Sequence, residues 1–450
     1  MELPAFVSAV TERLTAAGFA CHAVGGCVRD SLLGLTPHDW DLTTNALPEQ
    51  TAALFDDYTV IPTGLPHGTV TVLSDGRPLE ITTYRTDGAY RDHRHPDSVV
   101  FVTDITEDLR RRDFTVNAMA WHPQSGLCDP FGGQADLHNR LLRCVGKAEE
   151  RFTEDALRIL RALRFAATYG FTVESETADA LFRCAPLLAD VAAERVRAEL
   201  DRLLTGTFVG KVLREFYEVL YPVLPELRAM AGHEQCSRYH DRDVLEHTVA
   251  AVELSPPTVA VRLALLLHDS GKPACFTRGE DGEGHFYGHA AVSESIAVAV
   301  TQRLRYDRRM QETVRSLVKY HDTPIDDTDA AVRRWLNRLG EERLRLLLDV
   351  QEGDARAHAA WVVPTRMAEI TALRERVDRI VAEGQCLSLK SLAINGDDLK
   401  AAGFPAGKTM GECLRYLLDE VLAGQLPNEH GILLTKALDY FAQNRYNKIR

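Results

Sequence analysis

Residues 25–41 read Gly-Gly-Cys-Val-Arg-Asp-Ser-Leu-Leu-Gly-Leu-Thr-Pro-His-Asp-Trp-Asp. Two glycines, Gly25 and Gly26, precede a short helix-like run, and two carboxylates, Asp39 and Asp41, follow it. Alternate residues of an extended strand point to the same side, so these two carboxylates would project together. Paired carboxylates beside a glycine turn predict a Mg²⁺ site that faces the phosphates of a nucleotide. This is the minimum equipment for metal-assisted phosphoryl or nucleotidyl transfer.

Length and composition restrict the class of protein. A chain of 450 residues predicts three or four domains. No apolar run approaches the ~20 residues of a membrane span, and the N-terminus does not resemble a signal peptide. The nine cysteines are scattered, without a Cys-x-x-Cys pair, which favours a reducing cytoplasm over a disulfide framework. A net charge of −13 excludes a uniformly basic nucleic-acid binder but leaves room for a local basic groove.

The pattern of apolar residues changes along the chain. Residues 69–73 and 79–84 read as strands and residues 8–18 as a helix, so residues 1–145 predict an α+β or α/β domain. After about residue 150 helical periodicity dominates, as in residues 176–204 and 331–351. The expected fold class is therefore α+β, with a sheet domain followed by mostly helical domains. The expected boundaries give domains at 1–145, 146–232, 233–384 and 385–450.

A second polar segment, Arg111-Arg112-Asp113-Phe114-Thr115-Val116-Asn117-Ala118, suits a nucleotide. Arginines bind phosphate, and a carboxylate and an amide bind ribose hydroxyls. The plainer interpretation is a surface salt-bridge cluster that opens a helix.

A third segment, Thr153-Glu154-Asp155-Ala156-Leu157-Arg158, reads as the start of a helix with Thr153 as its N-cap. Asp155 and Arg158 are three residues apart, so on a helix they would project from one face. An acceptor and a fork of donors could then discriminate base edges, because a mismatched base would leave polar groups unpaired.

These motifs together resemble the nucleotidyltransferases of the DNA polymerase β superfamily, specifically class II bacterial tRNA nucleotidyltransferases and their poly(A) polymerase relatives. The chain matches Gly-Gly-x-Val-Arg-Asp followed by Asp-x-Asp, then Arg-Arg-Asp-Phe-Thr-x-Asn-Ala, then Glu-Asp-x-x-Arg, in family order. The resemblance implies that Asp39 and Asp41 hold catalytic Mg²⁺ and that Asp155 and Arg158 select CTP or ATP. The expected nucleotide-binding residues in these motifs are Gly25, Gly26, Arg29, Arg112, Asp113, Asn117, Asp155 and Arg158. Arg161 and Arg164 continue the row of Arg158 and could steer phosphates, or could equally be solvated helix charges.

Two neighbouring features refine this expectation. The polar segment 85–96 lies where members of the family that add the terminal adenosine have a flexible loop, so its presence favours complete CCA addition. Glu80 is a candidate third carboxylate near the metals, although a strand glutamate is more often simply solvated.

Downstream, imidazole and carboxylate side chains recur on successive expected helices. Such ligands suit a divalent transition metal that activates water. The plainer interpretation of each histidine alone is a core or cap residue. The order resembles HD-domain phosphohydrolases, and the resemblance implies a metal site made of His247, His268, Asp269, His289, His321 and Asp354.

The sequence therefore predicts a cytoplasmic CCA-adding tRNA nucleotidyltransferase with an inserted HD domain, whose partners are tRNA, CTP and ATP. Alternatives are a poly(A) polymerase, a partial CC- or A-adding enzyme, or an HD phosphatase or 2′,3′-cyclic phosphodiesterase acting on RNA ends. A non-catalytic tRNA-binding module would leave both metal-ligand constellations unexplained. The sequence does not predict the oligomeric state.

Overall fold

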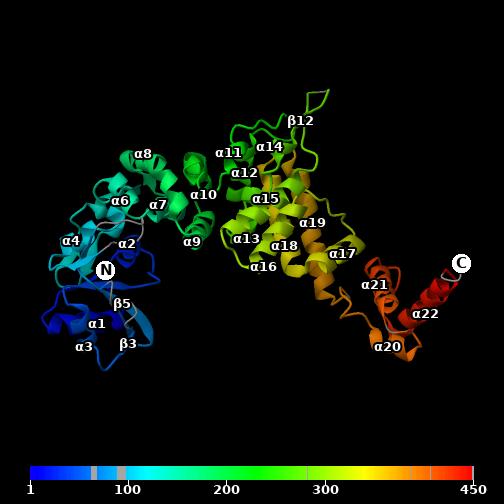
Figure 1. The fold of residues 1–450 in the computed structure, drawn as a ribbon, viewed down its shortest axis with the longest axis horizontal. Coiled ribbons are helices and arrows are strands. Elements are labelled where there is room, and N and C mark those ends of the chain that lie inside the picture. Colours follow the sequence, from blue (N-terminus) through cyan, green and yellow to red (C-terminus); the bar gives the residue numbers. More distant parts are fainter. Residues whose placement is uncertain (62–67, 89–97, 281, 386, 406, 448–450) are drawn as a thin grey trace. The chain divides into compact units, whose positions relative to one another are not determined.

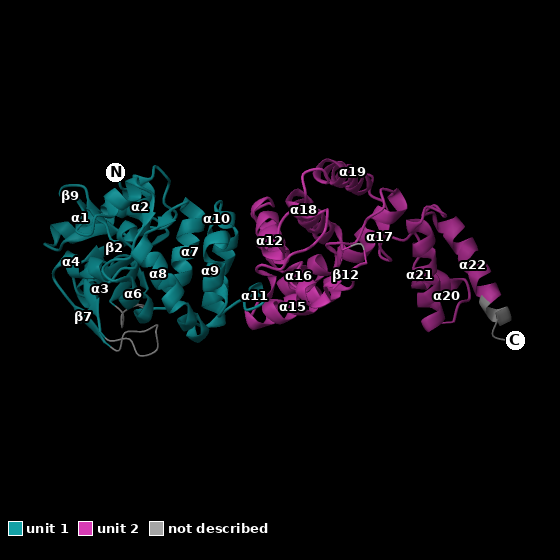
Figure 2. Cartoon of the chain, turned by 90° about the horizontal axis from the view of Figure 1, so that it is seen from above, with its two compact units in different colours: residues 1–228 teal, residues 229–450 magenta. Residues whose placement is uncertain are grey.

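The computed structural model describes residues 1–61, 68–88, 98–280, 282–385, 387–405 and 407–447, without the side chains of 444–447 (Figure 1). Two compact units divide the chain, Met1–Arg228 and Ala229–Arg450 (Figure 2). The division lies close to the expected boundary at residue 232, whereas the other expected boundaries stay predictions. Among the described residues, no helix combines the length and apolarity needed to cross a lipid bilayer.

The first unit begins with a mixed seven-stranded sheet, which confirms the expected α+β class. Its strand order is β3-β4-β5-β2-β1-β8-β9, and all neighbours are antiparallel except β2 and β5, which are parallel. The strands are β1 (Cys21–Val24), β2 (Asp41–Thr44), β3 (Thr59–Ile61), β4 (Thr69–Ser74), β5 (Arg77–Thr83), β8 (Ala120–His122) and β9 (Gly126–Cys128). A separate pair, β6 (Arg85–Asp87) and β7 (Val99–Phe101), flanks residues 89–97, so most of the expected loop at 85–96 lies outside the described residues.

Short helices accompany this sheet. They are α1 (Ala5–Ala16), α2 (Gly26–Leu32), α3 (Pro48–Leu54), α4 (Ile105–Arg110) and α5 (Gly133–His138). The central strands are apolar on the face that packs against helices: Leu42, Leu79 and Ile81 are fully buried. Val24 and Ala120 pack with Leu109 of α4 in one cluster, which fixes α4 beside the ends of β1 and β8.

Helices make up the rest of the first unit. They are α6 (Ala148–Glu154), α7 (Leu157–Tyr169), α8 (Ser175–Cys184), α9 (Ala193–Leu204), α10 (Val209–Phe216) and α11 (Leu227–Met230), the last of which crosses the division between the units. Helix α7 carries a buried apolar face and an arginine-bearing face, as its 3.6-residue periodicity predicts. A short parallel pair, β10 (Leu141–Leu142) and β11 (Thr172–Val173), ties the chain before α6 to the chain after α7.

The second unit is almost entirely helical. Its helices are α12 (Val244–Glu253), α13 (Val259–Leu267), α14 (Lys272–Cys275), α15 (His289–Arg303), α16 (Arg308–Tyr320), α17 (Asp329–Leu339), α18 (Glu341–Ala357), α19 (Val363–Ala382), α20 (Gly396–Ala401), α21 (Lys408–Leu422) and α22 (His430–Asn447). A small hairpin, β12 (Thr277–Arg278) with β13 (Gly284–His285), projects between α14 and α15. Buried apolar residues of α20–α22, including Leu399, Leu417 and Leu433, form a cluster of their own.

Two expected helices are each divided in two. The segment 176–204 forms α8, a 3₁₀ turn over Ala185–Asp190 and α9, because Pro186 lacks the N–H that a continuing helix needs. The segment 331–351 divides at Gly340, whose φ of 76° leaves the helical region and ends α17 before α18 begins.

Candidate active site and candidate metal centre

The glycine turn places the first strand beside an arginine. Gly25 has a φ of 79°, and a Cβ built on it would lie 3.0 Å from Arg112 Nη1. Glycine is therefore required both by the backbone conformation and by the close approach of Arg112. The N–H of Gly25 donates to Met119 O at 3.1 Å, which joins the turn to the chain entering β8.

Three carboxylates lie close together where β2 begins beside the middle of β5. Asp41 opens β2 and pairs in register with Glu80 of the parallel strand β5. Asp39 and Asp41 are exposed while Trp40 between them is buried, so both carboxylates project to the open side as expected. Within the described chain, no hydrogen bond or salt bridge engages the carboxylates of Asp39, Asp41 or Glu80. Reduced solvation raises the pKa of Asp41, Glu80 and Asp39 raise it further, and Arg112 lowers it.

Asp39 and Asp41, but not Glu80, line one part of a cleft of about 740 Å³ inside the first unit. Arginines supply most of its remaining charge. The cleft is lined by Gly25, Gly26, Arg29, Asp39, Asp41, Arg112, Asp113, Asn117, Arg161, Arg164, Tyr169 and Arg202, among others. Carboxylates and guanidinium groups in one cleft can hold a cation and a polyphosphate at the same time.

Asp113 is the buried centre of a charged network. Its Oδ2 accepts two hydrogen bonds from Arg161 of α7, at 2.6 and 2.9 Å, and its Oδ1 accepts from Asn117 Nδ2 at 3.0 Å. Burial opposes ionisation of Asp113, but Arg161 and the Asn117 hydrogen bond outweigh it and hold its pKa well below the usual value. The network fixes α7 against the sheet domain and turns Arg161 into the cleft.

Arg29 and Arg164 are also partly engaged by neighbours. Arg29 is buried and donates to Asn117 Oδ1 at 2.6 Å and to the Tyr169 hydroxyl at 2.7 Å. Arg164 forms an ion pair with Glu199 at 2.6 Å and lies over the ring of Phe165. Both arginines line the cleft, and both also connect its walls.

The third motif differs from its expected geometry. Thr153 lies inside α6 instead of capping a helix, and Asp155 is extended between α6 and α7, so Asp155 and Arg158 do not share one helical face. Asp155 Oδ1 accepts from Leu157 N at 3.1 Å, and this local hydrogen bond stabilises the break. Asp155 pairs with Arg195 at 3.0 Å, and Arg158 pairs with Glu154 at 2.7 Å. Neither residue is among those lining the cleft, whereas Arg161 and Arg164 are.

The second unit brings all six expected HD-site residues together. They come from different helices: His247 from α12, the pair His268-Asp269 from the end of α13, His289 from the start of α15, His321 from the end of α16 and Asp354 from α18. Asp269 Oδ2 lies 3.6 Å from His247 Nε2 and 3.2 Å from His268 Nε2, and its Oδ1 lies 3.5 Å from His289 Nε2 and 3.7 Å from His321 Nε2. Asp354 Oδ1 lies 2.9 Å from His247 Nε2. Asp269 thus stands between two groups of ligands.

The histidines share one orienting device. Nδ1 of each donates to a main-chain carbonyl, at 2.6 Å for His268, 2.9 Å for His289, 2.7 Å for His321 and 3.3 Å for His247. A proton on Nδ1 leaves the Nε2 lone pair free to bind a metal. The Nε2 atoms of His289 and His321 are only 3.2 Å apart, so two lone pairs face each other. Such an arrangement is unfavourable without a cation or a proton between them, and these residues therefore fit a metal centre.

Burial and charge also shift the ionisation of this cluster. Burial alone would lower the pKa of His268, but Asp269 and Asp354 raise it to about 10. Burial and the neighbouring His268 lower the pKa of His321 to about 4. Such opposite shifts within one cluster are typical of functional sites.

Sequence reasoning missed several residues of this pocket, whose volume is about 690 Å³. Lys272 donates to Gln235 and lies 2.7 Å from Asp269 Oδ2. Its position three residues after Asp269 on a helical turn was the signal that could have identified it. His240 comes from a loop, and only the folded chain reveals its place.

Comparisons with known proteins agree with the fold and the cleft. Three family models match: the "Poly A polymerase head domain" at residues 21–143, the "Probable RNA and SrmB- binding site of polymerase A" at 170–230 and "tRNA nucleotidyltransferase domain 2 putative" at 289–437. The CCA-adding enzyme of Lactiplantibacillus plantarum is 44% identical over 446 residues, 96% of each chain. That of Latilactobacillus sakei is 34% identical, over 96% of this chain and 98% of the relative.

Solved structures give the same result. The Bacillus stearothermophilus CCA-adding enzyme in complex with CTP matches with a TM-score of 0.73 and 28% identity, over 99% of this chain and 100% of that one. The Thermotoga maritima CCA-adding enzyme complexed with tRNA is 20% identical with a TM-score of 0.58, over 96% and 94% of the two chains, and supports the fold alone. Full-length identity to curated relatives, together with the glycine turn, carboxylates and arginines of the cleft, shows that this chain belongs to the family of bacterial CCA-adding enzymes.

Proposed function

We propose that this chain is a tRNA nucleotidyltransferase that builds or repairs the 3′-terminal CCA of tRNA from CTP and ATP. The observation that carries the proposal is the cleft of the first unit, which joins Asp39 and Asp41 to Arg112, Arg161 and Arg164. The relatives named above are CCA-adding enzymes, and solved relatives contain CTP or tRNA.

The acidic end of the cleft fits divalent cations. Asp39, Asp41 and Glu80 would hold them, because reduced solvation and, to a smaller extent, repulsion by Glu80 and Asp39 raise the pKa of Asp41. Hard oxygen ligands favour Mg²⁺. Mg²⁺ held there would lower the pKa of the 3′-hydroxyl and offset negative charge on the triphosphate.

The remaining residues of the cleft bind and orient the nucleotide. Arg112 and Arg164 can donate to phosphate oxygens, and Asn117 lies where a ribose hydroxyl could accept or donate. The 3′-hydroxyl of tRNA attacks the α-phosphorus, a new phosphodiester bond forms, and pyrophosphate leaves. The chain contributes mostly position and charge stabilisation to this reaction.

Base selection is the finer part of the proposal. The family resemblance assigns it to Asp155 and Arg158, whose charges are satisfied by Arg195 and Glu154 in this structure. Arg158 also donates to the carbonyl of Arg111 at 3.1 Å, next to cleft-lining Arg112. We infer that a correct base must replace the Asp155–Arg195 and Arg158–Glu154 pairs, so that a wrong base would leave charged groups unpaired.

A nucleotide-addition assay tests the main proposal. tRNA lacking its last three nucleotides is incubated with CTP alone, ATP alone or both. We expect two cytidines with CTP and completion by one adenosine when ATP is present. Unlimited growth on ATP alone would instead identify a poly(A) polymerase, and growth that stops after CC a partial enzyme.

Two variants sharpen this test. Asp39→Ala should abolish addition of both nucleotides, whereas Asp75→Asn, in the turn between β4 and β5, should not. Addition by Asp39→Ala at the wild-type rate would refute the assignment of the cleft. Asp155→Ala should relax nucleotide choice more than it slows chemistry, and unchanged selectivity would refute its role.

A second function is favoured by the metal centre of the second unit. We propose that the six residues around Asp269 hold a divalent transition metal centre of the HD phosphohydrolase type, because four oriented imidazoles and two carboxylates converge there. A metal bound there would activate water for phosphoester hydrolysis.

The rim of this pocket suggests the substrate. Tyr287 lines the pocket, is 80% exposed and stacks on His285. Tyr239 also lines it, and the ring centroid of Trp361, which is 60% exposed, lies 5.3 Å from that of Tyr239. Exposed aromatic rings bind unpaired nucleobases by stacking. A phosphoester at an RNA end, such as a 2′,3′-cyclic phosphate, therefore fits better than a small phosphate ester without a base.

Hydrolysis assays test this second function. We expect release of phosphate or opening of the 2′,3′-cyclic ring with Mn²⁺, Co²⁺ or Ni²⁺, and loss of that activity in Asp269→Asn with CCA addition intact. Absence of hydrolysis with all of these metals in the wild-type chain would refute it.

A further inference from the structure

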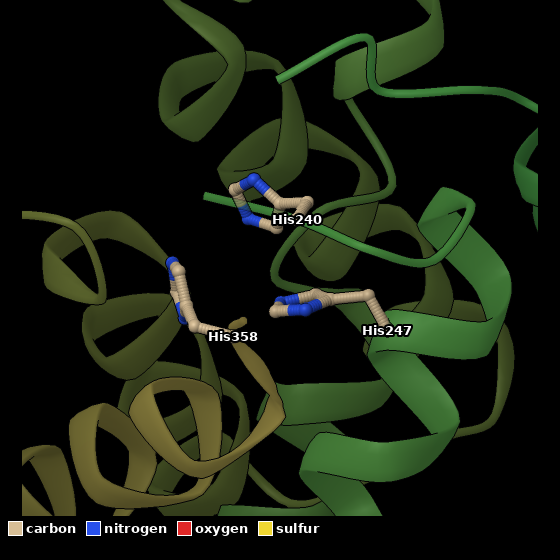
Figure 3. Close-up of side chains that lie close together, drawn as sticks. All are labelled: His240, His247 and His358. Carbon is tan, nitrogen blue, oxygen red and sulfur yellow. The ribbon is translucent and has the colours of Figure 1, made fainter. Parts of the chain in front are cut away.

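A group of three histidines lies beside the six-residue centre and contributes two residues that the centre does not include. His240, His247 and His358 each place an imidazole nitrogen within 4.8 Å of the others (Figure 3). Ring centroids are 4.5 Å apart for His240 and His358, 4.9 Å for His240 and His247, and 5.3 Å for His247 and His358. Figure 3 shows the three rings around a common space. His247 belongs to α12, His240 to the loop before α12, and His358 caps the end of α18.

His358 is oriented in the same way as the histidines of the six-residue centre. Its Nδ1 donates to the main-chain carbonyl of Asp354 at 2.8 Å, which leaves the Nε2 lone pair free. Nδ1–carbonyl hydrogen bonds of this kind accompany metal-binding histidines, because they fix the tautomer and the ring.

The fold also fixes His240 against His358. The N–H of Ala359 donates to Tyr239 O at 2.9 Å, and Arg242 Nη1 donates to Ala357 O at 2.8 Å. These bonds tie the loop before α12 to the end of α18 on both sides of the histidine pair. Nδ1 of His240 is buried, and within the described chain it has no hydrogen-bond partner. A buried imidazole nitrogen without a partner is costly unless a ligand satisfies it.

The common space between the rings therefore fits a single ligand that accepts lone pairs from imidazole nitrogens. Neutral imidazoles offer lone pairs, and no carboxylate or carbonyl is recorded as a partner of His240 Nδ1 among the described residues. A divalent transition metal satisfies several imidazole lone pairs at once. His247 borders this space, but its Nδ1 donates to Ala357 O and its Nε2 faces Asp354 at 2.9 Å, so its one lone pair belongs to the six-residue centre.

We propose that His240 and His358 form a further cation site beside His247 in the pocket, in addition to the positions on the two sides of Asp269. The inference rests on the metal centre of the second proposed function and is independent of CCA addition. His240 and His358 both line the pocket, so this cation keeps open positions toward it. A phosphate oxygen of the substrate, or water, would complete the coordination of this cation.

Charge explains how a further cation is accommodated. Asp269, Asp322 and Asp354 line the pocket together with Lys272, so their formal sum is two negative charges. The four positive charges of two divalent cations already exceed these two negative charges. A third cation therefore needs a bound anion to balance its charge. Inorganic phosphate should therefore strengthen binding at the histidine site more than binding beside Asp269.

The test measures bound Co²⁺ in the full chain. Wild type, His240→Gln, His358→Gln and the control His285→Gln are saturated with Co²⁺ with and without inorganic phosphate, freed of unbound metal and analysed for metal content. His285 lines the same pocket but is outside all three groups. Co²⁺ held by Asp39 and Asp41 is common to all four proteins and cancels in the differences.

We expect His240→Gln and His358→Gln each to lose one equivalent that His285→Gln keeps, with the largest difference in phosphate. Equal metal content in all four proteins, or weaker binding at unchanged stoichiometry, would overturn the further site and leave the six-residue centre intact. A wild type that binds no more Co²⁺ than Asp269→Asn would overturn both the six-residue centre and the further site. Far-UV circular dichroism and CCA addition by the same samples verify that each variant is folded.

Discussion

The ion pair between Asp113 and Arg161 offers a quantitative check on how the helical part of the first unit is held against the sheet. Asp113→Asn removes the charge while keeping the shape, so Arg161 loses two hydrogen bonds of 2.6 and 2.9 Å to a carboxylate oxygen. The Asn117 and Phe114 N–H groups that donate to Oδ1 would then face an amide.

The size of the effect follows from Coulomb's law. Opposite charges about 4 Å apart attract by about 4 kcal/mol at an effective dielectric constant of about 20. Arg161 is 33% exposed, so solvent screens part of this attraction, and desolvation of the pair offsets more. We expect Asp113→Asn to destabilise the first unit by about 2–3 kcal/mol.

A double-mutant cycle isolates the pair. Urea unfolding of wild type, Asp113→Asn, Arg161→Gln and the double variant is followed by tryptophan fluorescence in a Trp335→Phe, Trp361→Phe background. Only Trp40 and Trp121, both in the first unit, then report. Asp57→Asn, which breaks an exposed ion pair with Arg13 of 2.6 Å, serves as the control and should change stability little.

Two results would refute this reasoning. One is a coupling energy below about 0.5 kcal/mol, which is the range of independent sites. The other concerns pH. The pKa of Asp113 is lowered in the fold, so the stabilisation is complete above the unfolded value of about 3.9 and is lost as pH falls through the lower folded value. Wild type and Asp113→Asn should therefore converge in stability on acidification, and a constant difference would contradict the ion pair.

The remaining predictions concern the two centres. Glu80→Gln should slow addition of both CMP and AMP by about a hundredfold, with little change in the KM for the nucleotide. Thr71→Val, at the residue of β4 that pairs in register with Glu80, serves as the control and should leave the rate unchanged. Equal rates for the two variants in single-turnover assays would contradict a role for Glu80 as the third carboxylate. Because the pKa of Asp41 is raised, protons compete with Mg²⁺ at a higher pH than for an ordinary aspartate, so the Mg²⁺ concentration for half-maximal addition should increase as pH falls; a pH-independent requirement would exclude this competition. Tyr287→Ala and Trp361→Ala should each raise the KM for a 2′,3′-cyclic nucleotide about tenfold. CCA addition and hydrolysis of bis(p-nitrophenyl) phosphate, which has no base, should be unchanged. An equal rise in KM for the cyclic nucleotide and for bis(p-nitrophenyl) phosphate would refute base stacking.

Sequence could predict those parts of the sites that local geometry determines. Asp39 and Asp41 project together because they flank a buried residue at the start of a strand, which alternation alone predicts. The HD-site histidines lie at helix ends or on helix faces toward one core, and periodicity locates these positions. Glu80 became more than a weak candidate only through the parallel register of β2 and β5, which no short segment encodes.

Sequence failed where local hydrogen bonds or distant segments decide. The Asp155 side chain bonds to Leu157 N and interrupts the helix that its periodicity predicts, so the expected common face with Arg158 does not form. His240 has no pattern of its own, because a main-chain hydrogen bond between Tyr239 and Ala359, distant in sequence, brings it to His358.

The two centres differ in donor chemistry, and this difference explains how one chain could keep them separate. Among the described residues, the cleft of the first unit offers carboxylates, arginines and one histidine, His38, and hard oxygen donors bind Mg²⁺ in preference to softer metals. The centre of the second unit offers oriented imidazoles whose Nδ1 atoms are occupied, and this set binds transition metals far more strongly than Mg²⁺. Excess cellular Mg²⁺ would therefore serve nucleotidyl transfer without displacing a transition metal from the proposed hydrolytic centre, and substitution of either ligand set is expected to leave the other centre intact.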